Sequence, residues 1–207
     1  MNKKQIKALQ DIAANLQHKK DFLLTFENEA RAEKNEPPLP RHICGEQKTP
    51  TGYAVLDGYV GVYYHHPAAG LPHDDDYDEP TDLLRREIED QLENGDYYLV
   101  REPFGAEVSS SRIRDLLKEH STGLSLEKSR KEICLTAYNE YGHKIQSRFN
   151  SLYVRRAVEA VGGKVCLYIG KHRTKRQPCP FLIVKQASDP FDLDHGIYAI
   201  VMPLNRR

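Results

Sequence analysis

Long apolar runs are missing from this chain of 207 residues, whose mean hydropathy is -0.66. No window approaches the roughly 18 consecutive apolar residues that a membrane-spanning helix needs. The basic start, Met1-Asn2-Lys3-Lys4, is not followed by the apolar segment of a secretory signal. We therefore expect a cytoplasmic protein without a membrane partner.

Cysteine is also scarce, and the four residues are Cys44, Cys134, Cys166 and Cys179. None forms a C-x-x-C pair, and none lies at zinc-finger spacing from a pair of histidines. This pattern is typical of reduced, structural thiols in a cytosolic protein. Glycine-rich phosphate loops, H-E-x-x-H and EF-hand loops are missing too, so the main expectation is a protein without a cofactor.

Net charge is the third absence, because 30 basic residues balance 30 acidic ones. The balance conceals two opposed blocks. Residues 74–96 hold eleven acidic and two basic side chains (-9), and residues 143–187 hold ten basic side chains and one acidic (+9). A uniformly basic coat is excluded, but a local basic patch is not.

The N-terminal segment is patterned as a helix. Ile6, Leu9, Ala13 and Leu16 recur at helical spacing, which predicts a helix over residues 3–34 that could break near Asp21. The prolines within residues 36–40 end it. The helix either docks on the core or forms a homo-oligomer.

A β-hairpin is predicted for residues 53–64. Two apolar runs, 53–56 and 59–64, flank Asp57-Gly58, which is typical of a two-residue type I′ turn. A helix is expected over residues 80–93, and a strand over 97–100.

The C-terminal half predicts three helices followed by strands. The first helix is expected to begin at a cap within Ser109-Ser110-Ser111, to carry Ile113, Leu116 and Leu117, and to end before Gly123. The other two helices are expected over residues 126–141 and 144–161, and the strands over 164–169, 180–185 and 196–202. This order of elements is that of a winged helix. The fold class is therefore α+β: an N-terminal helix, an antiparallel hairpin plus helix, then C-terminal helices and a small antiparallel sheet.

The same patterns divide the chain into three parts. Residues 1–36 are the N-terminal helix, residues 37–103 an α+β part with the Asp-Gly hairpin and the acidic loop, and residues 104–207 a basic part of helices and a hairpin.

The basic block predicts a nucleic-acid surface. Cations on one face of the third helix, together with a basic hairpin tip, gain free energy by releasing counterions from phosphates. Two amide side chains offer groups that read adenine edges. The predicted contact residues are Lys144, Gln146, Arg148, Asn150, Arg155, Lys171, Arg173, Lys175 and Arg176.

A metal site is the first alternative. A loop with imidazole and carboxylate donors would hold a divalent metal in a nuclease or phosphoesterase. The predicted ligands are His65, His66, His73 and Asp75, and Asp74, Asp76 and Asp78 are further carboxylates of the same loop. A protein-interaction module, whose opposed charge blocks pair with each other or with a partner, is the second alternative. The leading expectation is a DNA-binding regulatory protein that is not an enzyme.

Overall fold

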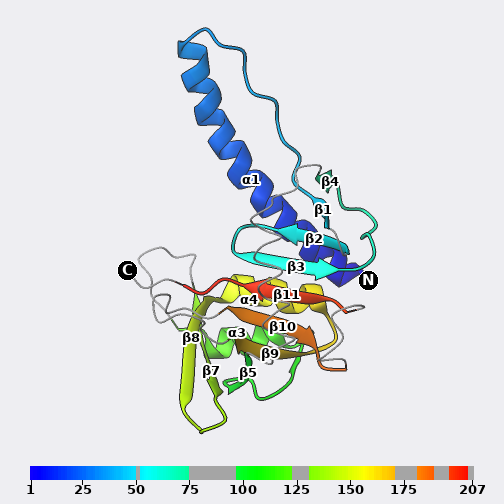
Figure 1. The fold of residues 1–207 in the computed structure, drawn as a ribbon, viewed down its shortest axis with the longest axis vertical. Coiled ribbons are helices and arrows are strands. Elements are labelled where there is room, and N and C mark those ends of the chain that lie inside the picture. Colours follow the sequence, from blue (N-terminus) through cyan, green and yellow to red (C-terminus); the bar gives the residue numbers. More distant parts are fainter. Residues whose placement is uncertain (50–51, 75–96, 123–130, 171–180, 189–195, 205–207) are drawn as a thin grey trace.

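The computed structural model describes residues 1–49, 52–74, 97–122, 131–170, 181–188 and 196–204. Figure 1 shows a long helix followed by a twisted sheet and two short helices. The helices are α1 (Lys3–Glu33), α3 (Ile113–His120) and α4 (Ser151–Val161). The strands are β1 (Glu46–Thr49), β2 (Gly52–Leu56), β3 (Val60–Tyr64), β4 (His73–Asp74), β5 (Tyr97–Glu102), β6 (Val108–Ser109), β7 (Glu132–Tyr138), β8 (Lys144–Asn150), β9 (Lys164–Gly170), β10 (Leu182–Gln186) and β11 (Tyr198–Val201).

Within the described residues, eleven strands form one mixed sheet in the order β4-β1-β2-β3-β11-β10-β9-β5-β7-β8, and β6 pairs with β9. Strands β1 and β4 pair in parallel, and the other pairs are antiparallel. Strand β11 pairs with β3, with Tyr63 opposite Tyr198. The last strand of the chain therefore completes the sheet beside the first hairpin.

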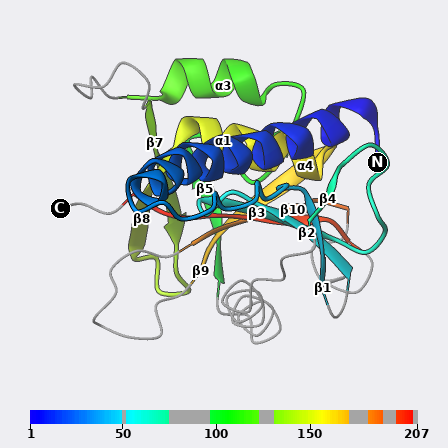
Figure 2. The same ribbon diagram turned by 90° about the horizontal axis from the view of Figure 1, so that it is seen from above.

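The main core lies between one face of the sheet and the helices. Figure 2 shows α1, α3 and α4 on the same side of the strands. Leu9 and Ile12 of α1 and Val158 of α4 are completely buried in this core, together with Val62 and Val184 of the sheet. A second apolar cluster on the other face is rich in tyrosine and includes Tyr63, Tyr168 and Tyr198.

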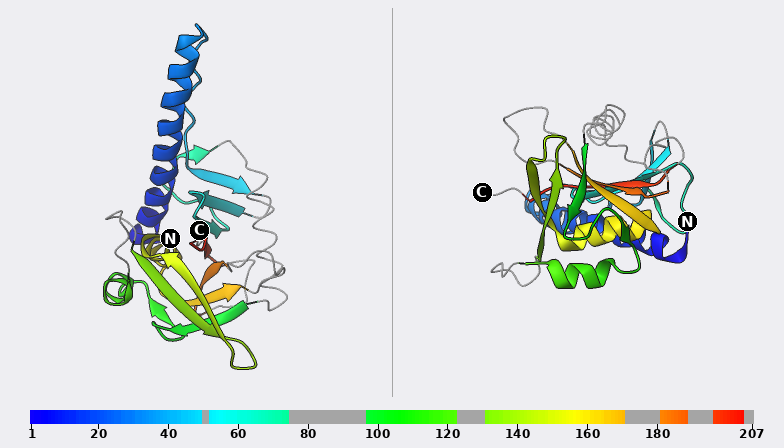
Figure 3. Two further views of the ribbon diagram at one scale, coloured as in Figure 1. Left: turned by 90° about the vertical axis from the view of Figure 1, so that its left-hand side faces the viewer. Right: turned by 90° about the horizontal axis from the view of Figure 1, so that it is seen from below.

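Helix α1 has a docked half and a projecting half. Its start is fixed by a capping box between Asn2 and Gln5, and its buried residues are all in the first half. The second half extends away from the sheet with residues 34–45 running back beside it (Figures 1 and 3). In the part of the chain described above, no helix is both long and apolar enough to cross a membrane.

The expected winged helix is wrong. Residues 132–138 form β7 and residues 144–150 form β8, where two helices were predicted, and only residues 151–161 of the third predicted helix are helical. β7 and β8 form an antiparallel hairpin closed by residues 139–143. The α+β class and the strands β9, β10 and β11 are confirmed.

The error has a simple physical cause. Side chains four residues apart share a face in a helix, but they also share a face in a strand. Lys144 and Arg148 have this spacing, as do Ile145 and Phe149, so these pairs fit a helix and a strand equally well. The decisive residue is Ser147, which is buried beside Phe149 as strand alternation requires.

The N-terminal prediction succeeds in most respects. Helix α1 is continuous through Asp21, and β2 and β3 form the predicted hairpin. The turn is not type I′, because only Gly58 has positive φ (82°). Instead, Oδ1 of Asp57 accepts hydrogen bonds from the N–H groups of Tyr59 and Val60, both at 2.9 Å. The helix predicted over residues 80–93 lies outside the described residues.

Candidate functional site

Three of the predicted nucleic-acid contacts lie on the outer face of β8. Lys144, Gln146 and Arg148 are exposed there, while the alternating residues point toward the main core. Nε2 of Gln146 donates to Thr136 Oγ1 at 3.1 Å, and Nη1 of Arg148 lies 3.6 Å from Glu132 Oε2. Two of the three residues are therefore engaged in local contacts, and one of the two cations, Arg148, is opposed by a carboxylate.

The remaining predicted contacts are elsewhere. Arg155 lies on α4, which packs on the core side of the sheet, and Asn150 is buried at the start of that helix. The predicted stripe is therefore divided between the two faces of the sheet. Lys171, Arg173, Lys175 and Arg176 lie outside the described residues.

The helical layer instead gathers cations from four places in the sequence. Two adjoining depressions, of about 270 and 420 Å³, share Arg114 as a lining residue. Seven cationic side chains and two acidic ones, Asp11 and Glu159, line them. We call this surface the basic groove, and its cations are Lys3, Lys4, Lys7, Arg114, Lys118, Lys131 and Arg155.

The smaller depression lies at the amino end of α4. Asn150 caps this helix by accepting the N–H of Leu152 at 2.9 Å, and the first turn contains no acidic residue. Ser151 fixes the neighbouring segment, because its N–H and its hydroxyl both donate to the carbonyl oxygen of Lys131. The partial positive charge of the helix end therefore adds to the charge of the lining cations.

Glu159 orders two of the arginines. Its Oε1 accepts from Nε of Arg114 at 2.8 Å, and its Oε2 lies 3.7 Å from Nε of Arg155. The hydrogen bond that Arg114 donates to Glu159 raises the pKa of Arg114 above its usual value, so this guanidinium remains charged. One carboxylate thus holds two cations at the junction of the depressions and leaves a net positive surface.

The other cations of the basic groove are largely solvated. Lys7 pairs with Asp11 at 2.9 Å within α1, and Lys118 lies 3.9 Å from Asp115. Both pairs are exposed, so they constrain the lysines only weakly. Mobile lysine heads beside ordered arginines suit phosphate groups, which bind guanidinium in a two-pronged geometry and ammonium as a point charge.

Among the described residues, the three predicted metal-binding histidines do not belong to a cluster of three metal-ligating side chains. His65 is half-buried after β3, His66 is exposed, and His73 is exposed on β4. Asp75 lies outside the described residues. Across the described ranges, the cluster of three metal-ligating side chains that does form is His42, Cys44 and Asp74.

Sequence reasoning missed six of the seven cations of the basic groove. Local signals exist for two pairs, because Lys3 and Lys7, and Arg114 and Lys118, each have the four-residue spacing that places both on one helical face. No local pattern indicates that α1, α3 and α4 meet.

The helices meet through contacts distant in sequence. Nε2 of Gln5 donates to the carbonyl oxygen of Val161 at 2.8 Å, which fixes the first turn of α1 against the end of α4.

Comparison of the chain with known protein families, with curated proteins and with solved structures gives no match.

Proposed function

We propose that this protein binds nucleic acid through the basic groove. One observation carries the proposal: seven cations, opposed by two carboxylates, line two adjoining depressions on the helical layer. A phosphate backbone is the ligand class that rewards several spaced cations, because each neutralised phosphate releases condensed counterions.

The chemistry of the basic groove favours the backbone over the bases. Lysine and arginine heads dominate its polar lining, and Asn150 already uses its side-chain oxygen to cap α4. Contacts to phosphates position a protein on nucleic acid without reading sequence. We therefore expect binding that depends steeply on salt and weakly on sequence, with duplex DNA as the first ligand to test.

The test is the salt dependence of binding to a duplex DNA and to a single-stranded RNA. Fluorescence anisotropy measures the affinity at each salt concentration. The variant Lys118→Ala/Lys131→Ala changes two exposed residues of the basic groove. The slope of log K against log salt is negative, and this variant should reduce its magnitude by about two. Inorganic phosphate serves as a third ligand.

The matched control is Lys144→Ala/Arg148→Ala, which removes two exposed cations from the outer face of β8. It should leave the slope nearly unchanged. A larger effect of the control than of the groove variant would overturn the assignment of the surface. Absence of binding to either nucleic acid at low salt, with or without phosphate binding, would overturn the proposal itself.

The projecting half of α1 favours a second candidate function, which is self-association. Phe22 and Leu23 are each 60% exposed and Phe26 is 55% exposed. The rings of Phe22 and Phe26 make an edge-to-face contact, with their centroids 4.9 Å apart. Ile43, in the segment 34–45 beside α1, adds another exposed apolar side chain. Exposed apolar patches of this kind mark interaction sites.

A second copy of the chain is the partner that fits the exposed aromatic pair. In an antiparallel pair with its two-fold axis near residue 24, Phe22 lies opposite Phe26 of the other copy. A two-fold interface requires such self-complementarity.

Sedimentation velocity over a range of protein concentrations tests this candidate. We expect a dimer that Phe22→Ser/Phe26→Ser converts to a monomer. The control Tyr141→Ser changes an aromatic residue that is 77% exposed in the β7–β8 loop, and should have no effect. A monomer at every concentration, or equal dissociation by the control, would refute self-association.

A further inference from the structure

Three donor side chains of different chemistry converge where the segment 34–45 meets β4. An imidazole nitrogen of His42, the sulfur of Cys44 and a carboxylate oxygen of Asp74 all lie within 4.8 Å of one another. We propose that these three residues form a zinc site, distinct from the basic groove.

The donors are placed at nearly the separations that zinc requires. Nε2 of His42 lies 2.8 Å from Oδ1 of Asp74. Tetrahedral zinc, with bonds of about 2.0 Å to nitrogen and oxygen and about 2.3 Å to sulfur, holds its ligand atoms roughly 3.3 to 3.6 Å apart. The observed 2.8 Å between His42 and Asp74 is shorter than this and all three donor pairs lie within 4.8 Å, so zinc entry requires the His42 and Asp74 side chains to move slightly apart.

The burial of the donors also fits a metal. The carboxylate of Asp74 is fully buried, and Cys44 is 3% exposed. Besides His42, Nε2 of Gln47 donates to Oδ2 of Asp74 at 3.4 Å, and a bound cation would compensate this buried carboxylate further. The His42 side chain is 28% exposed and marks the solvent side of the cluster.

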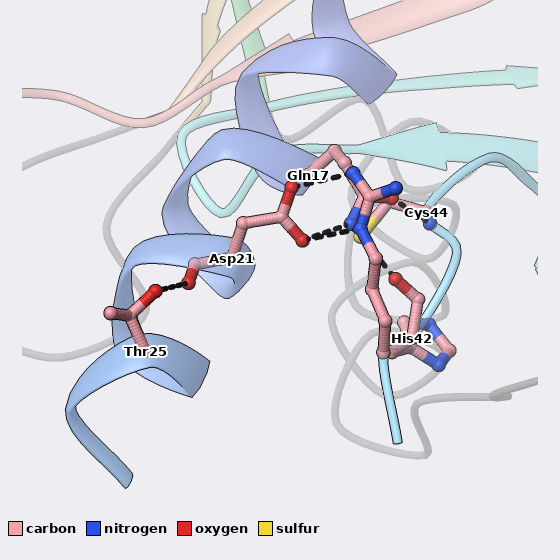
Figure 4. A network of polar contacts seen from close by, with 6 residues as sticks. Gln17, Asp21, Thr25, His42 and Cys44 are labelled. Atoms are coloured by element: carbon pink, nitrogen blue, oxygen red, sulfur yellow. Dashed lines mark hydrogen bonds and ion pairs between the residues drawn. The ribbon is translucent and has the colours of Figure 1, made fainter. Parts of the chain in front are cut away.

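Gln17 of α1 fixes the backbone that carries two of the donors. Figure 4 shows its amide between Asp21 and the segment that contains His42 and Cys44. Its Oε1 accepts the N–H of Cys44 at 2.8 Å, and its Nε2 donates to the carbonyl oxygen of His42 at 2.8 Å. One side chain thus holds both ends of the His-x-Cys segment, as outer-shell groups do in metal sites.

The approach to β4 is equally constrained. A Cβ at Gly45 would lie 2.0 Å from the carbonyl oxygen of Pro72, so only glycine permits this contact. Glu46 N–H donates to the same oxygen at 2.8 Å, and the parallel pairing of β1 with β4 places Gln47 opposite Asp74. Cys44 and Asp74 are therefore brought together by the sheet itself.

The donor set selects the metal class. A thiolate ligand disfavours magnesium and calcium, which prefer all-oxygen sites, whereas zinc accepts sulfur, nitrogen and oxygen. Three protein ligands leave a fourth position for water or a ligand. The sequence pattern did not reveal this site, because Asp74 is 30 residues or more from its partners.

The test uses the full chain after chelator treatment. Titration calorimetry with Zn²⁺ should give one equivalent, and Co²⁺ should give the absorption band of a thiolate-to-cobalt transition. Cys44→Ser should abolish the band and weaken zinc binding at least tenfold, and Gln17→Ala should weaken it by about 10–100-fold. Cys134→Ser and His73→Ala are the matched controls and should behave like the unchanged chain.

A second measurement avoids dependence on the folding of variants. Cys44 is buried, so its alkylation requires opening of the segment 34–45, and the incubation is made long enough to modify Cys44 in the metal-free unmodified chain. Zinc should then slow the alkylation of Cys44, but not that of the half-buried Cys134, as read by mass spectrometry. Failure to bind either metal, a cobalt band that survives Cys44→Ser in a folded variant, or equal alkylation of Cys44 with and without zinc would each overturn the proposal.

Discussion

Arg41 forms a bidentate ion pair with the carboxylate of Asp21: Nε lies 2.9 Å from Oδ1, and Nη2 lies 2.6 Å from Oδ2. The pair joins the segment 34–45 to the middle of α1. Hydrogen bonds from Arg41, and secondly from Gln17, lower the pKa of Asp21 from 3.8 to about 2. A pair this exposed contributes little to global stability, but it reports whether the segment is attached to α1.

The first prediction concerns the titration of Asp21. Its folded-state pKa is depressed, so its contribution to attachment is complete above the ordinary value of 3.8 and is lost as pH falls through about 2. The chemical shift of the Asp21 carboxyl carbon should therefore titrate near 2. In Arg41→Ala the midpoint should move toward 3.8, and an unchanged midpoint would show that Arg41 does not hold the carboxylate.

The second prediction concerns Asp57, whose carboxylate is fully buried. Its Oδ2 accepts from Asn15 at 2.6 Å and lies 3.7 Å from Nη1 of Arg156, a side chain that is 15% exposed. Asp57→Ala removes the turn acceptor and leaves a buried cation without this counter-charge. We expect a loss of about 3–5 kcal/mol in the free energy of unfolding measured with urea.

The matched variant Asp57→Asn separates the two roles. Its amide oxygen still accepts the N–H groups of the turn, but the charge opposite Arg156 is gone. We expect a smaller loss of about 1–3 kcal/mol. Equal losses for the two variants would mean that the charge, and not the turn, carries the effect.

The third prediction concerns the hydrogen bond that the hydroxyl of Tyr64 donates to Glu46 Oε1 at 2.8 Å. Burial, and then this bond, raise the pKa of Tyr64 well above its usual value, so the phenol remains a donor. Tyr64→Phe should cost about 1.5–3 kcal/mol of unfolding free energy, the range for bonds to charged groups.

Tyr53→Phe provides the control for this variant, because the ring of Tyr53 stacks on that of Tyr64 with the two centroids 6.3 Å apart. Among the described residues, the Tyr53 hydroxyl has no hydrogen-bond partner that the change would remove. Its loss should stay within about 0.5 kcal/mol. Similar losses for both variants would contradict a special role of the bond to Glu46.

The fourth prediction concerns Gly162, which ends α4 with φ 76° and ψ 168°. This backbone conformation is essentially restricted to glycine, and a Cβ would lie 2.8 Å from Nε2 of Gln5. Gly162→Ala should cost about 1–3 kcal/mol by urea unfolding. Gly163 also has positive φ (68°), but its Cβ would meet no atom within 4 Å, so Gly163→Ala should cost less. Equal costs would exclude the contact with Gln5 as a cause.

Elements with strong local patterns were predictable from the sequence. The 31 residues of α1 repeat their apolar side chains over several turns, and the β2–β3 hairpin has apolar runs on both sides of Asp57-Gly58. The β7–β8 hairpin was not predictable in this way, because four-residue spacing fits a helix and a strand equally. There the alternation of Ser147 and Phe149 carried the strand signal.

The basic groove was beyond local reasoning for another reason. Its cations come from segments as distant as Lys3 and Arg155, and packing between α1, α3 and α4 brings them together. The block count correctly located an excess of positive charge in residues 143–187, but a count along the chain contains no information about which face each cation occupies.

The contact between Gln5 and Val161 spans 156 residues. At a synthesis rate of about 5–20 residues per second, the end of α4 is translated roughly 6 to 26 seconds after the end of α1. Leu9 and Ile12 lack the cover of α4 for that period, although β2, which also contacts α1, is translated earlier. The nascent chain therefore presents an amphipathic helix before its partner helix is made, and we expect chaperones to bind α1 during translation.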